Sequence, residues 1–157
     1  MAGTGAKKVR EPRKARGPRA RSSQYVALLG LQAADPLELV ERVRKGLSFS
    51  AFAQFQKRTA LSTEDVARLV DIPIRTLNRR KAEGRLRSDE SDRLVRASRV
   101  VGGAIALFEG DVLAALRWLG APQVALGGRR PIEIAGTDVG AREIEALVGR
   151  IEHGIPS

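Results

Sequence analysis

The chain has 157 residues, no cysteine and a formal net charge of +10. This length allows one compact core or two small lobes, and the lack of cysteine excludes a disulfide framework, a thiol nucleophile and a cysteine-bound metal. The longest apolar run covers only residues 100–108, well short of the ~20 residues that a membrane-spanning helix needs, so we expect a cytoplasmic protein with no membrane partner.

Residues 1–23 are rich in Lys, Arg, Gly, Pro and Ala and nearly lack large apolar side chains. Such a composition cannot bury a core, so we expect a disordered basic tail. The single acidic residue of this segment is Glu11, and its basic residues are Lys7, Lys8, Arg10, Arg13, Lys14, Arg16, Arg19 and Arg21. A basic tail on a nearly neutral body favours a polyanionic partner such as nucleic acid, and the alternative is a tail that only increases solubility.

Helical signals begin at residue 35. Asp35 and Pro36 suit the N-cap and the first position of a helix that Gly46 ends. The apolar residues that recur at helical spacing here are Leu39, Val40, Val43 and Leu47. A second helix follows its expected cap, Ser48. Its apolar stripe, which is more typical of a core than of a ligand site, consists of Phe49, Phe52 and Phe55.

A helix-turn-helix is predicted at about residues 62–83. Ser62 and Asp65 cap the first helix, and its inner face is Val66, Ala67, Leu69 and Val70. Ala67 supplies the small residue that a crossing helix requires, and Asp71 tolerates the positive φ of the turn. The second helix runs from about Ile74 to Glu83, with Ile74 and Leu77 inward and Gly84 at its end.

The outer face of this second helix is polar. Arginine and asparagine are side chains that read guanine and adenine edges in the major groove. The DNA-binding residues that this pattern predicts are Arg75, Thr76, Asn78, Arg79 and Lys81. Because polar outer faces occur on helix pairs in many folds, a purely structural role remains the alternative.

A longer helix is predicted from about Ser88 to Glu109. Its inward residues are Leu94, Ala97, Val101, Ile105 and Phe108. Gly102 and Gly103 in its middle disfavour a helix, which indicates a close crossing by another helix.

Two further helices follow, the first capped by Asp111 and ending at Gly120, the second capped by Thr137 and ending at Gly154. The first carries the apolar residues Leu113, Leu116, Trp118 and Leu119, and the second has Ile144, Leu147, Val148 and Ile151 facing inward. No stretch alternates with a period of two, so the predicted fold is all-α.

Few residues suggest catalysis, a cofactor or a metal. The single histidine, His153, suits the C-terminal end of a helix, and one histidine without cysteine does not build a metal site. The Gly127-Gly128 pair lacks the spacing of a phosphate loop and is expected to form a tight connection. Glu143 and Glu145 are two residues apart and do not face each other on a helix. The sequence therefore predicts no enzyme, no cofactor and no metal site.

Two groups of motifs, taken in order, resemble a known family. The first group is the run from Leu61-Ser62 to Arg80, then Glu83-Gly84-Arg85-Leu86 and Glu90-Ser91-Asp92-Arg93-Leu94. The second is Trp118-Leu119, Leu126-Gly127-Gly128-Arg129-x-Pro131 and Gly149-Arg150-Ile151-Glu152-His153-Gly154. They resemble the Xre-type region and the C-terminal toxin-binding domain of MbcA/ParS/Xre antitoxins. The resemblance covers about residues 35–157 and excludes the basic tail.

This resemblance implies an all-helical antitoxin of a type II toxin–antitoxin pair. A helical Xre-like region would cover residues 24–110, and a toxin-binding domain residues 111–157. The implied partners are a RES-domain toxin that consumes NAD, operator DNA for autoregulation, and a second copy in a homodimer within a hetero-oligomer. The residues implied to cover the toxin's active site are Arg150, Glu152, His153, Gly154, Ile155, Pro156 and Ser157.

Two other functions compete with this interpretation. The first is a stand-alone Xre-type transcriptional regulator without a toxin, and the second is a nucleoid-associated protein that binds DNA through its tail without sequence preference. The C-terminus favours the antitoxin, because a pure dimerisation domain does not need residues 154–157 beyond its last apolar turn.

Overall fold

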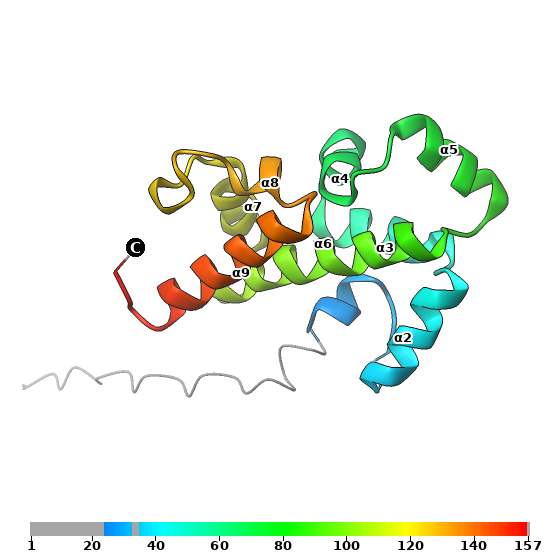
Figure 1. The fold of residues 1–157 in the computed structure, drawn as a ribbon, viewed down its shortest axis with the longest axis horizontal. Helices are drawn as coiled ribbons and strands as arrows, with labels where there is room; N and C mark the ends of the chain where they lie inside the picture. Colours follow the sequence, from blue (N-terminus) through cyan, green and yellow to red (C-terminus); the bar gives the residue numbers. More distant parts are fainter. Residues whose placement is uncertain (1–23, 33–34, 157) are drawn as a thin grey trace, which may run out of the picture.

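The computed structural model describes residues 24–32 and 35–156 (Figure 1). The predicted disorder of the basic tail therefore lies outside the described residues, as does Ser157. After a short helix over residues 24–28, the elements are α2 (Pro36–Lys45), α3 (Phe49–Thr59), α4 (Thr63–Val70), α5 (Ile74–Glu83), α6 (Ser88–Leu107), α7 (Val112–Gly120), the 3-10 turn η1 (Val124–Leu126), α8 (Pro131–Ile134) and α9 (Asp138–Glu152). Two isolated bridges and no strand occur in these ranges, which confirms the all-α prediction.

Four predicted caps are confirmed. The side chains of Ser48, Ser62, Asp111 and Thr137 each accept a hydrogen bond from a backbone N–H in the first turn of α3, α4, α7 and α9. Asp35 occupies the N-cap position of α2, but its side chain makes no capping hydrogen bond. Pro36, at the first position of α2, has a ring that fixes a helical φ, and this favours the start of the helix although that bond is absent.

The central element is α6, which is 20 residues long. It packs against α2, α3, α4, α7 and α9, and Figure 1 shows α9 lying along it. Leu94, Val101 and Ile105 of α6 are buried in a hydrophobic cluster that reaches from the first helix to α9. The helix-turn-helix and the C-terminal helices therefore share one core.

The short helix over residues 24–28 crosses α6 at Gly102. A Cβ on Gly102 would lie 3.3 Å from Tyr25 Cβ and 3.4 Å from Tyr25 Cα, which confirms the predicted close crossing. At Gly103 the nearest atom would be Val148 Cγ1 at 3.9 Å, an ordinary contact. The sequence pattern does not predict the short helix, because a run of five residues beside a low-complexity segment is too short to show a helical period.

Ile74 and Ile151, which are predicted to face inward, are exposed, and so are Val40 and Leu113 among the apolar positions of α2 and α7. Leu113 lies about 200° around α7 from the buried Ala115, since each residue turns a helix by about 100°. Val40 lies beside, not on, the buried face of α2, where Leu39 is. Ile74 and Ile151 lie in the terminal turns of α5 and α9, at the edge of the core.

Gly140, near the start of α9, lies against the preceding helix. A Cβ there would overlap the carbonyl oxygen of Ile134, whereas the Cβ position of Gly149 in the same helix is open. We expect Gly140→Ala to lower the free energy of unfolding by about 1–3 kcal/mol, because α8 must shift. We expect Gly149→Ala to raise it by about 0.5–1 kcal/mol, because alanine favours a helix interior. Urea unfolding measures both changes, and undiminished stability of the Gly140 variant contradicts this packing.

Candidate nucleic-acid and partner-binding sites

The turn between α4 and α5 has the predicted geometry. Asp71 has φ 49° and ψ 49°, in the left-handed region, and the N–H of Ile72 donates to the carbonyl oxygen of Ala67 at 3.0 Å. Ala67, Ile72 and Leu77 are all buried between the helices. The small residue, the left-handed turn residue and the apolar contact are therefore each where a helix-turn-helix requires them.

The outer face of α5 carries Arg75, Asn78, Arg79 and Lys81, which are exposed. Within the described residues, none of these side chains makes a hydrogen bond or an ion pair with the protein. Thr76 differs from the prediction because it is half-buried. It lies about 100° from the buried Leu77, at the boundary between the two faces.

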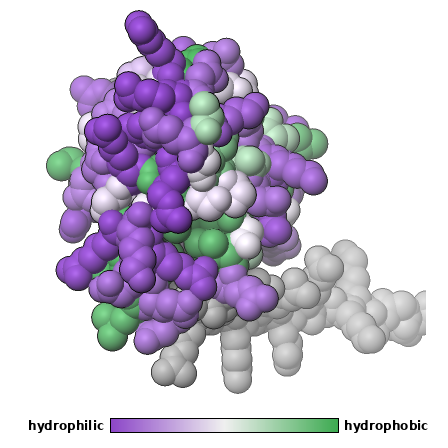
Figure 2. Space-filling view, turned by 90° about the vertical axis from the view of Figure 1, so that its right-hand side faces the viewer, coloured by the Kyte–Doolittle hydropathy of each residue, from purple (hydrophilic) through white to green (hydrophobic). Residues whose placement is uncertain are grey.

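The end of the molecule that carries α5 faces the viewer in Figure 2. Hydrophilic side chains dominate this surface, and the hydrophobic ones are scattered between them. A surface of this kind suits a polar, charged partner and not an apolar one.

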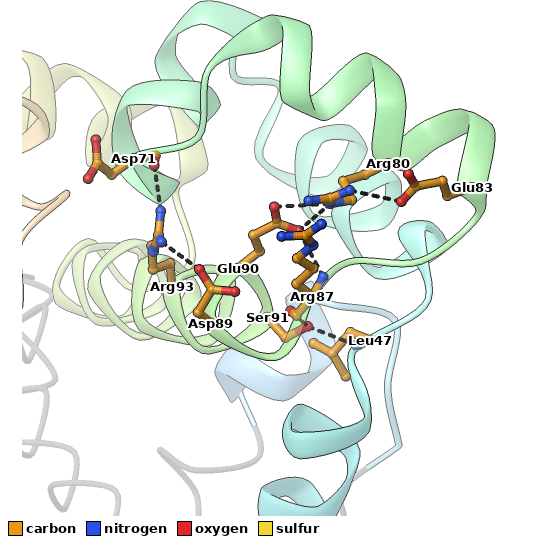
Figure 3. Close-up of polar contacts among 9 residues, drawn as sticks. All are labelled: Leu47, Asp71, Arg80, Glu83, Arg87, Asp89, Glu90, Ser91 and Arg93. Atoms are coloured by element: carbon orange, nitrogen blue, oxygen red, sulfur yellow. Dashed lines mark hydrogen bonds and ion pairs between the residues drawn. The ribbon is translucent and has the colours of Figure 1, made fainter.

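The turn before α5 and the C-terminal part of α5 are both attached to the first turns of α6 (Figure 3). Before the start of α5, Arg93 Nη1 donates to the carbonyl oxygen of Asp71 at 2.7 Å, and Arg93 Nη2 pairs with Asp89 at 2.7 Å. Near the end of α5, Arg80 Nε donates to both carboxylate oxygens of Glu90, at 2.7 and 3.0 Å. The helix with the exposed cations is thus fixed to the central helix by two arginines.

The Arg80–Glu90 pair is buried: Arg80 is 2% and Glu90 5% exposed. Arg80 Nη1 also donates to Glu83 at 2.9 Å, and the N–H of Arg87 donates to Glu90 at 2.8 Å. Burial alone raises the pKa of the Glu90 carboxyl, but the hydrogen bonds from Arg80 and Arg87 outweigh burial and hold that pKa below its usual value. The hydrogen bond to Glu90 raises the pKa of Arg80.

The sequence pattern assigns no role to Arg80, although one signal was available. Arg80 follows the buried Leu77 by three residues, so both lie on the same helix face. A charged residue on an inward face requires a partner of opposite charge. That partner, Glu90, lies on the next helix.

The low pKa of Glu90 makes stability depend on pH. The unfolded chain, in which a glutamate has a pKa of about 4.3, takes up this proton at a higher pH than the folded protein does. The stabilisation that ionised Glu90 contributes is therefore fully present above the pKa of the unfolded chain. It is lost as the pH falls through the lower pKa that Glu90 has in the folded protein. We expect Glu90→Gln to make the melting temperature fall less steeply with pH below about 4.5. Scanning calorimetry in about 0.5 M salt, which screens exposed ion pairs, measures this slope; an unchanged slope contradicts the assignment.

The C-terminal end of α9 is the second candidate site. Residues 151–156 are exposed, with Ile155 at 53%, and Arg150 is half-buried. The N–H of Gly154 donates to Ile151 at 3.1 Å and the N–H of Ile155 donates to Arg150 at 2.9 Å. With φ 64° at Gly154, these two bonds form a Schellman motif. The motif fixes the direction in which Ile155 leaves the helix.

Local contacts define the geometry of the remaining predicted features. His153 Nδ1 lies 2.6 Å from the carbonyl oxygen of Gly149, at the C-terminal end of α9. Gly127 and Gly128 have φ 65° and 78° and form a tight connection between η1 and α8. In the described part of the chain, no cluster of three metal-ligating side chains occurs, and no helix is long and apolar enough to cross a membrane.

The chain has a left-handed turn between α4 and α5, an exposed cationic helix face and a helical domain on the same core. These features define a helix-turn-helix protein with an appended C-terminal domain. Residues 38–99 match the antitoxin Xre-like helix-turn-helix domain, and residues 103–154 match the antitoxin Xre/MbcA/ParS C-terminal toxin-binding domain.

Relatives named antitoxin Xre agree with these matches. One from Yersinia enterocolitica is 34% identical over 128 residues, covering 81% of this chain and 86% of that protein. One from Photorhabdus laumondii is 35% identical over 116 residues, covering 73% and 78%. One from Pseudomonas putida is 32% identical over 130 residues, covering 82% and 80%. The chain belongs to the Xre antitoxin family, and is a regulatory protein and not an enzyme.

Proposed function

We propose that the chain is the antitoxin of a type II pair in the cytoplasm, that it neutralises a RES-domain, NAD-consuming toxin, and that it represses its own operon by binding operator DNA. Residues 24–110 form the Xre-like region and residues 111–157 the toxin-binding domain. The chain acts as a homodimer within a toxin–antitoxin hetero-oligomer. The observation that carries this proposal is the exposed C-terminal segment, held in one direction at the end of a domain that matches toxin-binding domains.

The chemistry of this segment suits a nucleotide pocket. Within residues 150–155, Arg150 supplies a cation, Glu152 an anion and Ile155 an exposed apolar side chain. A NAD pocket is concave and accepts both charged and apolar groups, so such an end fills it without any reaction. The covering residues are Arg150, Glu152, His153, Gly154, Ile155, Pro156 and Ser157.

Operator binding is assigned to α5. Arg75, Asn78, Arg79 and Lys81 are exposed and have no partner among the described residues, and a helix fits the major groove of B-DNA. Thr76 contributes its exposed part beside them. Figure 1 places α5 and the C-terminal end of α9 at opposite ends of the described chain. One antitoxin can therefore hold toxin and DNA at the same time.

Co-expression with the neighbouring reading frame tests the proposal. We expect the neighbour alone to arrest growth and deplete cellular NAD, and this chain to reverse both effects. A harmless neighbour, or toxicity that this chain does not relieve, contradicts the antitoxin function and leaves a stand-alone regulator as the explanation.

A further inference from the structure

The packing of α5 leaves its rotation about its own axis weakly determined. Only two of its ten residues, Leu77 and Arg80, are buried. A single apolar contact at Leu77 allows the helix to turn about that point, because hydrophobic contact has no preferred direction. The bond from Arg93 holds the carbonyl oxygen of Asp71, in the turn before α5, so a directional contact from α5 itself is needed to fix the rotation of the helix.

Arg80 makes this directional contact. Its guanidinium is planar and rigid, and it donates from Nε to both oxygens of Glu90 and from Nη1 to Glu83. Glu90 is itself held by the N–H of Arg87 at the start of α6. Figure 3 shows the two side chains meeting between α5 and α6. A continuous set of hydrogen bonds, buried where Arg80 meets Glu90, therefore connects the central helix to α5, one residue away from Arg79.

We infer that Arg80 and Glu90 are a positioning pair that sets the rotation of α5, and with it the register in which Arg75, Asn78 and Arg79 meet base edges. This inference rests on the proposed binding of operator DNA. Arg80 is buried and so makes no contact with DNA itself. Recognition geometry tolerates only about 10–20° of misorientation, so a helix freed to rotate loses base contacts but keeps its positive charge.

The Arg80–Glu90 pair should therefore determine how well the protein distinguishes operator DNA from other DNA sequences, and not its general affinity for DNA. The probes are the duplex upstream of the chain's own reading frame and a scrambled duplex of equal composition. We expect Glu90→Gln to reduce the ratio of the two affinities about 10- to 100-fold, equivalent to the loss of about one bidentate base contact. Affinity for the scrambled duplex and its salt dependence should not change, because the phosphate-binding cations remain.

Glu133 provides a matched control. Like Glu90 it is the third residue of its helix and accepts hydrogen bonds from a backbone N–H and an arginine, both of Arg130. This pair is exposed and does not involve α5. We expect Glu133→Gln to leave the ratio of affinities unchanged.

A double variant separates positioning from stability. Replacing a buried ion pair by apolar residues of similar volume often preserves stability, so we expect Arg80→Met/Glu90→Met to fold and to neutralise the toxin as the wild type does. It should nevertheless discriminate as poorly as Glu90→Gln. Discrimination at the wild-type level in this folded double variant overturns the positioning role alone. A wild-type protein that prefers neither duplex overturns both the proposed operator binding and the positioning role.

Discussion

Deletion of residues 152–157 is expected to abolish toxin neutralisation while the protein stays folded. Residues 152–156 are exposed, so their loss removes no described side chain from the core. If these residues fill the toxin's active site, inhibition should weaken more than about 100-fold, which corresponds to about 2.8 kcal/mol of binding free energy. Titration of purified toxin with each antitoxin, with NAD consumption as the readout, measures the loss.

Two single substitutions sharpen this experiment. Ile155→Ser changes an exposed apolar residue in the segment proposed to cover the toxin's active site. Val139→Ser changes an exposed apolar residue at the opposite end of α9. We expect only the first to weaken inhibition, because buried apolar anchors contribute most to an interface. Full neutralisation by the protein that lacks residues 152–157 would refute the proposed role of the C-terminus.

Replacement of Arg75 and Arg79 by alanine is expected to remove the preference for operator DNA. Each arginine that reads a guanine contributes about 1–3 kcal/mol of discrimination, or about 5- to 150-fold in affinity. Toxin neutralisation should be unaffected, because α5 lies far from the C-terminal end of α9 (Figure 1). Fluorescence anisotropy with operator and scrambled duplexes measures the change.

Loss of charge alone is controlled by Arg117→Ala/Arg129→Ala. These arginines are exposed and lie in or next to α7 and η1, outside the helix-turn-helix. The control removes the same two positive charges, so we expect a small, equal loss of affinity for both duplexes. If the two double variants behave alike, α5 does not read the operator sequence.

Local sequence determined most of the helices and the caps at which several of them begin. Caps such as Ser62 and Thr137 bind N–H groups within three residues, and Asp71 adopts its left-handed conformation through its own backbone. These interactions join residues that are close together in the chain, so the local sequence specifies them without any tertiary contact. The exposed cations of α5 followed from the same helical period.

Residue burial was less predictable. Val40 and Leu113 are apolar but exposed, because the face that a helix buries depends on its neighbours and not on its own composition. The short helix over residues 24–28 also depends on its neighbours, because it lies against Gly102 in a helix about 75 residues further along the chain.

The sequence by itself determined an all-helical protein with a helix-turn-helix, an exposed cationic helix and a C-terminal tail. Only the tertiary structure decided that Arg80 and Glu90 meet, because their contact depends on the angle between α5 and α6. Only the tertiary structure, likewise, placed the Gly136 Cβ position 2.7 Å from the carbonyl oxygen of Arg68, where the loop after α8 lies against α4. Such contacts join segments that are separate in the chain, and no local pattern specifies how rigid helices orient when they pack.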